Sequence, residues 1–226
     1  MGESAYIGKE IFDTLEDKIL SLKTKPGAIL SENQLCERFG VSRSPIRSAL
    51  QGLQLEGLVI VTPYKGTQVT RMDFSIINQM IYQRMAVETF VIEDFIQAHD
   101  ELDMEKLRHL HCSMQELIRK KSFDAKSFYQ LDGRLHAVWF SAGRKDYLWE
   151  SIQNSNCNYT RFRMLDIVAV RNFQQIVDEH AAILEAIEKQ DRAAVRPLMQ
   201  QHLFGGVTRL GRLIFTDLKD YFTAPE

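Results

Sequence analysis

The sequence predicts a mainly α-helical protein in two domains, residues 1–73 and residues 74–226. Three observations predict this division. Apolar residues recur at helical spacing along most of the 226 residues. The β-branched runs that favour strands occur only at residues 58–62 and 67–70. Beyond residue 74 one helical segment follows another, which predicts that the second domain is an all-helical antiparallel bundle.

The first domain is predicted to contain three helices and a hairpin. Apolar residues spaced as on one helix face predict a first helix over residues 7–22: Ile7, Ile11, Leu15, Ile19 and Leu22. After the Pro26-Gly27 turn, Ser31 and Gln34 have capping-box spacing and predict the start of a second helix, which Gly40 ends. A third helix is expected from Ser42 to Leu55. The strands at 58–62 and 67–70 then surround a turn at residues 63–66.

The second domain is predicted to hold six or seven helices reaching about residue 222. Breaks are expected near residues 122–125, 143–146, 171–172 and 190–191. No apolar run approaches the roughly 20 residues that cross a bilayer. The N-terminus does not resemble a secretory signal. The three cysteines, Cys36, Cys112 and Cys157, form no CxxC pair, which favours a cytoplasmic location.

Two helices with a glycine-containing turn match a helix-turn-helix, in which the second helix enters the major groove of DNA. Arg43 and Arg47 lie four residues apart at the start of that second helix, where arginine can pair with guanine. Residues 38–71 contain five basic residues and one acidic residue, although the chain carries a net charge of −2. On spacing alone, a helical hairpin with solvated arginines remains an alternative.

The motifs "PGAILSENQLCERFGVSRSPIRSALQGLQLEGLV" and "KGTQV" resemble the N-terminal winged helix of GntR-family bacterial transcriptional regulators. The resemblance implies DNA contacts by Arg38, Ser42, Arg43, Ser44, Arg47, Lys65 and Gly66. The chain departs from the family pattern at Cys36 and at Ser48, where an acidic residue is common. We expect the loss of that acidic residue to free Arg47 from an ion pair.

Four residues of the second domain form a candidate metal site. Asp132 and His136 are four residues apart and share one face of a helix. His180 and His202 lie about ten and eleven residues from the turn at 190–191, so antiparallel helices would place them at the same height. A carboxylate with three imidazoles can bind a divalent transition metal. The alternative is four unrelated core residues.

This domain resembles the FCD branch of the family, named for the C-terminal domain of the fatty-acid regulator. The resemblance rests on "RMAVETF" at 84–90 and on the order Asp-x-x-x-His, His and a final His, with intervals of 4, 44 and 22 residues. It implies metal binding by Asp132, His136, His180 and His202, with zinc first and nickel or manganese as alternatives. The chain departs from that pattern at Leu135 and at Gly133. Gly133 and the Gly205-Gly206 pair are expected to loosen their helices. His99, His109 and His111 are expected at the surface.

The resemblance further implies that the metal anchors a small carboxylate or sugar-acid effector that controls DNA affinity. Arg84, Arg161 and Arg163 are candidates to bind the far end of that anion. We expect a repressor that acts as a homodimer on an inverted-repeat operator. One alternative is a regulator with a purely structural metal. Another is a DNA-binding metallohydrolase, for which Glu179 is the candidate general base.

Overall fold

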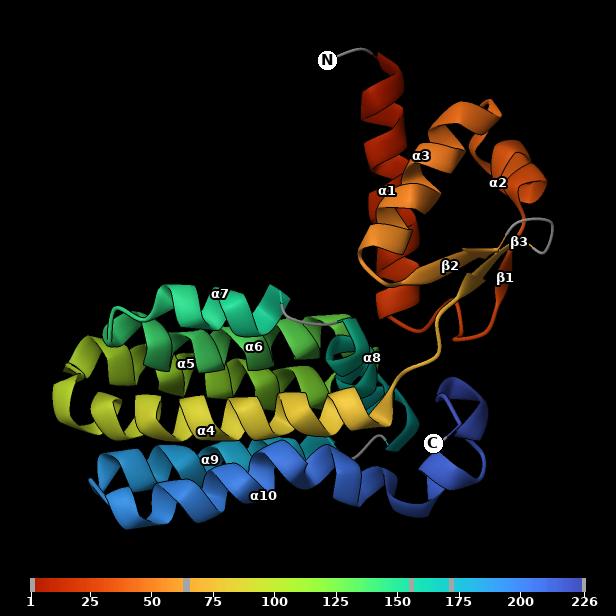
Figure 1. Ribbon diagram of the computed structural model, residues 1–226. Helices are drawn as coiled ribbons and strands as arrows, with labels where there is room; N and C mark the ends of the chain where they lie inside the picture. The colour runs from red at the N-terminus through yellow and green to blue at the C-terminus, as the bar shows by residue number, and fades with distance from the viewer. Residues whose placement is uncertain (1–2, 63–65, 155–156, 171–172, 225–226) are drawn as a thin grey trace. The chain divides into compact units, whose positions relative to one another are not determined.

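The computed structural model describes residues 3–62, 66–154, 157–170 and 173–224. The chain divides into two compact units (Figure 1). The first unit comprises Met1–Phe74 together with Cys157–Arg161 and Arg212–Glu226, and the second comprises Ser75–Asn156 and Phe162–Gly211. None of the helices in the described part of the chain has the length and apolar character that crossing a membrane requires.

The first unit is built on helices α1 (Glu3–Leu20), α2 (Glu32–Phe39) and α3 (Arg43–Leu55). Helix α3 packs against both α1 and α2. The apolar stripe predicted for the first helix is buried in the core of this unit through Ile11, Leu15 and Ile19. Helix α3 adds four buried residues to the same core: Ile46, Ala49, Leu50 and Leu53. The predicted amphipathic face of the first helix is therefore confirmed.

The predicted ends of the second helix are also confirmed. The Ser31 hydroxyl accepts a hydrogen bond from the Gln34 amide at 3.4 Å. Gly40 ends the helix at φ +65°, a left-handed conformation that glycine adopts without a steric cost. The first helix ends at Leu20 rather than at residue 22, because Leu22 itself has φ +59° and cannot continue a right-handed helix.

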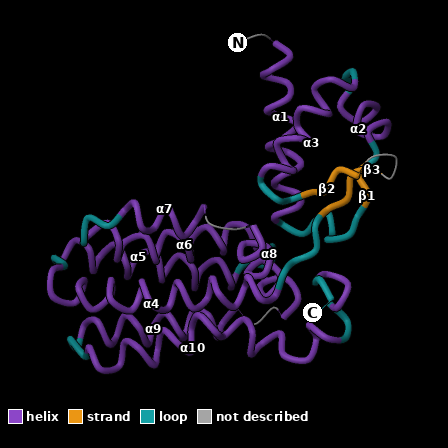
Figure 2. Tube along the Cα trace, viewed as in Figure 1, coloured by secondary structure: helices purple, strands orange, loops and turns teal. Residues whose placement is uncertain are grey.

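The first unit also contains a small antiparallel sheet (Figure 2). The predicted hairpin is formed by β2 (Val59–Thr62) and β3 (Gly66–Val69), with Val59 opposite Val69. Residues 63–65 of the predicted turn lie outside the described residues. The sequence did not predict β1 (Ile29–Leu30), which pairs with β3, because two residues are too short to show a strand period.

The junction that follows β3 is held by two other segments of the first unit. Arg161 donates a hydrogen bond to the Thr70 carbonyl at 2.6 Å. Met72 forms a β-bridge with Phe222, near the short 3-10 helices Gly211–Phe215 and Lys219–Tyr221. The Phe222 ring also contacts Phe74 edge-on. The junction is therefore part of a packed unit, and the first compact unit takes in segments from beyond residue 73.

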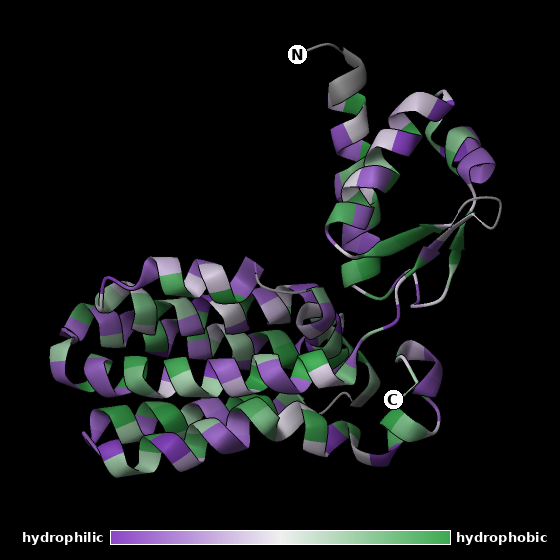
Figure 3. Ribbon diagram, viewed as in Figure 1, coloured by the Kyte–Doolittle hydropathy of each residue, from purple (hydrophilic) through white to green (hydrophobic). Residues whose placement is uncertain are grey.

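The helices α4 to α10 confirm the predicted helical bundle, and hydrophobic residues alternate with polar ones around them (Figure 3). They are α4 (Phe74–Ala98), α5 (Glu101–Arg119), α6 (Ala125–Ala142), α7 (Asp146–Asn154), α8 (Cys157–Leu165), α9 (Phe173–Glu188) and α10 (Arg192–Leu210). The pair α9 and α10 is antiparallel around a turn near residue 190, as the sequence predicted. The α4–α5 break at residues 99–100 was not predicted, since neither glycine nor proline marks it.

Candidate metal centre and nucleic-acid interface

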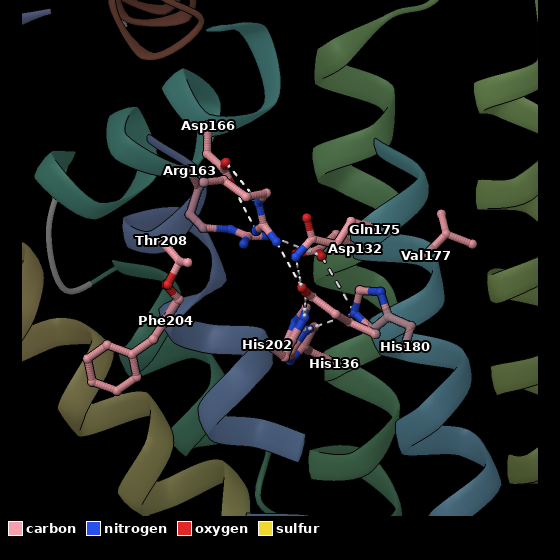
Figure 4. Close-up of polar contacts among 12 residues, drawn as sticks. Asp132, His136, Arg163, Asp166, Gln175, Val177, His180, His202, Phe204 and Thr208 are labelled. Carbon is pink, nitrogen blue, oxygen red and sulfur yellow. Dashed lines mark hydrogen bonds and ion pairs between the residues drawn. The ribbon is translucent and has the colours of Figure 1, made fainter. Parts of the chain in front are cut away.

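Three helices of the bundle bring the four predicted metal ligands together. Asp132 and His136 come from α6, His180 from α9 and His202 from α10 (Figure 4). One ligand atom from each residue lies within 4.8 Å of all the others. All four side chains are buried, with exposed fractions of 3% or less. The structure therefore agrees with the prediction that His180 and His202 lie at the same height on the antiparallel helices α9 and α10.

The imidazole Nε2 atoms converge on one point. His136 Nε2 lies 3.2 Å from His202 Nε2 and 3.3 Å from His180 Nε2. His180 Nε2 is 3.6 Å from Asp132 Oδ1. A tetrahedral metal about 2.05 Å from each nitrogen would separate the nitrogens by about 3.3 Å. The cluster could therefore hold a metal ion.

Two buried carboxylates orient the imidazoles from behind. His136 Nδ1 lies 2.5 Å from Glu88 Oε2, and His202 Nδ1 lies 3.0 Å from Glu179 Oε2. A carboxylate only accepts hydrogen bonds, so these contacts place the proton on Nδ1 and leave the Nε2 lone pair for a metal. The sequence did not predict these roles for Glu88 and Glu179, because each glutamate lies on a different helix from the histidine that it contacts. Among the described residues, His180 Nδ1 has no such partner.

The charges around the cluster suit a cation. Burial alone would raise the pKa of Asp132, but Arg163 at 3.0 Å and the imidazoles hold that pKa well below its usual range. Burial likewise opposes ionisation of Glu88, yet Arg84 and His136 lower its pKa to about 2. Burial lowers the pKa values of His180 and His202 well below 6.5. At neutral pH the site therefore presents ionised carboxylates and the neutral imidazoles of His180 and His202, the forms that bind metals.

Glu179 is not placed as a general base for hydrolysis. One of its carboxylate oxygens faces His202 Nδ1, and the other accepts hydrogen bonds from Arg209 Nη1 at 2.9 Å and from Gln175 at 3.1 Å. The hydrogen-bonded carboxylate supports a ligand instead of facing a reacting atom.

The three arginines proposed for an effector occupy different places. Arg163 contacts the candidate metal ligand Asp132. Arg84 pairs with Glu88, and its Nη2 lies 3.1 Å from His136 Nδ1. Arg161 belongs to the first unit, where it holds the junction and not the four-residue cluster. An effector role for these arginines stays a prediction.

The other histidines lie outside the cluster. His109 is exposed, as predicted. His99 and His111 are half-buried and not at the open surface, because each ring contacts a backbone carbonyl: His99 that of Phe95 and His111 that of Val177.

Most of the predicted DNA contacts lie at the start of α3, with Arg38 at the end of α2 and Gly66 at the start of β3. The described members of the set are all exposed: Arg38, Ser42, Arg43, Ser44, Arg47 and Gly66. Lys65 lies outside the described residues. Arg43 Nη2 donates a hydrogen bond to Asn33 Oδ1 at 3.0 Å. The expectation that Arg47 is free was wrong, because its Nε pairs with the Glu32 carboxylate at 3.1 Å from the neighbouring helix α2.

Comparison with known proteins identifies both parts of the chain. Residues 7–69 match the family described as bacterial regulatory proteins, gntR family, and residues 79–205 match the FCD domain. The chain belongs to the GntR family. The chain is thus a DNA-binding transcriptional regulator and not an enzyme, which decides against the metallohydrolase alternative.

Relatives span nearly the whole chain. The gluconate operon transcriptional repressor of Bacillus licheniformis is 30% identical over 88% of this chain and 82% of its own. The HTH-type transcriptional repressor RspR of Escherichia coli K12 is 26% identical over 87% of this chain and 86% of its own. The solved structure of E. coli McbR/YncC shares the fold, with a TM-score of 0.69 and 17% identity over 92% of this chain and 98% of that one.

Proposed function

We propose that this regulator is a repressor whose DNA affinity depends on a small carboxylate effector bound at a divalent metal. The buried cluster of Asp132, His136, His180 and His202 carries the proposal, because three imidazoles and an ionised carboxylate form a complete set of metal donors. Zinc suits these donors best, with nickel and manganese as alternatives.

Bound metal would act as a Lewis acid that anchors an effector carboxylate. Four protein ligands leave room for an additional donor around a metal that accepts more than four. The guanidinium groups of Arg84 and Arg163 already lie within the ligand shell's hydrogen-bond network, so they can meet an anion's other end. Arg161 is better suited to the junction, where it contacts Thr70.

Helix α8 offers a route from the metal site to the junction. Arg163 of α8 holds the ligand Asp132, and Arg161, two residues earlier, holds the Thr70 carbonyl. A shift of Asp132 on effector binding would therefore be transmitted through Arg163 and this helix to the contact that Arg161 makes with Thr70. A coupling free energy of about 1 to 3 kcal/mol would change DNA affinity about 5- to 150-fold. Two such chains would form a homodimer that binds an inverted-repeat operator.

A thermal-shift screen tests the proposal. The full-length protein would be loaded with Zn²⁺ or treated with chelator, then screened against small carboxylates and sugar acids. Gluconate is the first candidate, since one relative is a gluconate operon repressor. We expect at least one compound to raise the melting temperature of the zinc-loaded protein alone. That compound should change affinity for an operator selected from random DNA.

A purely structural metal gives a different result in the same screen. Chelation would lower the melting temperature, but no carboxylate would raise it in the presence of zinc. An unchanged melting temperature on chelation, with no zinc bound, would contradict the metal site itself.

A further inference from the structure

The four-residue cluster is supported by a second layer of buried charges that extends beyond the FCD match, which ends at residue 205. Arg209, near the end of α10, is the centre of this layer. We propose that Arg209 and Asp166 are positioning residues that fix the orientation of His202 toward a bound metal. The proposal rests on the proposed metal site and concerns residues that do not touch the metal.

A continuous relay of polar contacts connects these residues to the ligand. Asp166 accepts three hydrogen bonds from Arg209: two from Nε, at 3.0 Å and 3.3 Å, and one from Nη2 at 2.8 Å. Arg209 Nη1 donates to Glu179 Oε1 at 2.9 Å, and Glu179 Oε2 lies 3.0 Å from His202 Nδ1. The relay side chains are at most 4% exposed, so water does not substitute for them.

Bidentate pairing makes this relay directional. A planar guanidinium that binds one carboxylate through two nitrogens is held in one orientation. Arg209 therefore presents Nη1 to Glu179 in a set direction, and Glu179 in turn sets the plane of the His202 ring. Lysine, with a single ammonium, would keep the charge but not the direction.

The two glycines of α10 leave room for the relay. A Cβ at Gly205 would lie 2.6 Å from Arg209 Nη1, and a Cβ at Gly206 would lie 3.2 Å from Asp166 Oδ2. Helix α10 nevertheless continues through both glycines to Leu210. A close approach of charged side chains accounts for the presence of both glycines.

The position of Asp166 links the relay to a second ligand. Asp166 begins a π-helical turn, Asp166–Val170, directly after α8. Arg163, three residues earlier, holds the ligand Asp132 at 3.0 Å (Figure 4). One stretch of chain thus supports Asp132 through Arg163 and His202 through Arg209, and π-helical turns often mark such functional sites.

The test compares metal binding by full-length variants. Zn²⁺ affinity would be measured by competition with a chelator, and ligand geometry by the visible absorption of the Co²⁺-loaded protein. We expect Arg209→Met to weaken Zn²⁺ binding about 10- to 100-fold, as loss of an outer-shell partner typically does. Its Co²⁺ spectrum at saturating metal should shift, and Arg209→Lys should restore affinity only in part. Arg196→Met, exposed on the same helix, is the matched control and should leave both unchanged.

Gly205→Ala keeps every charge but displaces the Arg209 guanidinium. Alanine favours a helix by about 1 kcal/mol over glycine, so reduced Zn²⁺ affinity in this variant would not reflect a weaker helix. It also provides the test if Arg209→Met does not fold. Wild-type affinity and a wild-type Co²⁺ spectrum in folded Arg209→Met, or in Gly205→Ala, would overturn the proposal. A wild-type protein that binds neither metal would instead contradict the proposed metal site.

Discussion

The two functional regions of this chain differ in how their side chains are held. The predicted DNA contacts at the start of α3 are exposed, and Arg47 keeps 60% of its side chain open to solvent. The candidate metal ligands are at most 3% exposed and are surrounded by further buried charges. An exposed ion pair contributes little to stability, whereas a buried charge that loses its partner is costly. Substitutions at the predicted DNA contacts should leave the stability of the fold almost unchanged, whereas substitutions around the candidate metal centre should lower it.

The largest effect is expected from removing a ligand. His180→Ala and His202→Ala should each lower the metal affinity by more than the roughly 100-fold that an outer-shell loss can cause. The metal content of the purified variants would be measured by atomic emission. Full retention of metal in both variants would contradict the four-ligand site. Operator binding by these full-length variants should remain measurable, because the predicted DNA contacts lie in the first unit and the substituted residues in the second.

A substitution among the predicted DNA contacts should weaken DNA binding and leave metal binding unchanged. Arg43→Ala should weaken specific operator binding by about 1 to 3 kcal/mol, because a bidentate contact with guanine is lost. Metal content and the circular dichroism spectrum should match wild type, since the side chain is exposed. Fluorescence anisotropy with operator and scrambled DNA measures the effect. Equal specificity in the variant would remove Arg43 from the recognition surface.

The stability of the metal-free protein should depend on pH near neutrality, because the candidate metal site contains buried imidazoles. Burial lowers the pKa values of His180 and His202 below 6.5, so the unfolded chain binds protons that the folded chain does not. The free energy of unfolding should therefore fall as the pH decreases from about 7 to about 5.5. Glu179, whose pKa burial raises, opposes this trend, but the two imidazoles outnumber it.

Urea unfolding of the metal-free protein at several pH values measures this dependence. A variant with both imidazoles replaced, His180→Gln with His202→Gln, should show a flatter profile. A wild-type stability that rises on acidification over the same range would contradict the assignment of neutral imidazoles.

The smallest effect is expected at the exposed ion pair. Glu32→Gln removes the partner of Arg47 and one negative charge beside the predicted DNA surface. DNA affinity should rise by no more than a few-fold, since such pairs are worth about 0.2 to 1 kcal/mol. Glu37→Gln, exposed on the same helix, controls for the charge alone. A lower affinity in Glu32→Gln would show that the pair orients Arg47 for binding.

Local signals in the sequence were reliable where neighbouring residues decide the structure. Ser31 and Gly40 bound the second helix as predicted, because capping depends on residues a few positions apart. The intervals among the metal ligands were informative for a related reason: two regular helices joined by a short turn convert sequence distance into height. Arg47 shows the limit of such reasoning, since its partner Glu32 is fifteen residues away on another helix.

The sequence by itself determined the helix-turn-helix, the hairpin and a set of four donors able to converge, because periodicity, capping and helix rise are local properties. Only the tertiary structure decided what supports those donors. The candidate ligands are connected to four charged residues from other parts of the bundle: Glu88, Glu179, Asp166 and Arg209. The two adjacent glycines of α10 leave room for these side chains. Such contacts depend on which side chains meet in a dry interior, where each buried charge requires a partner that sequence spacing does not specify.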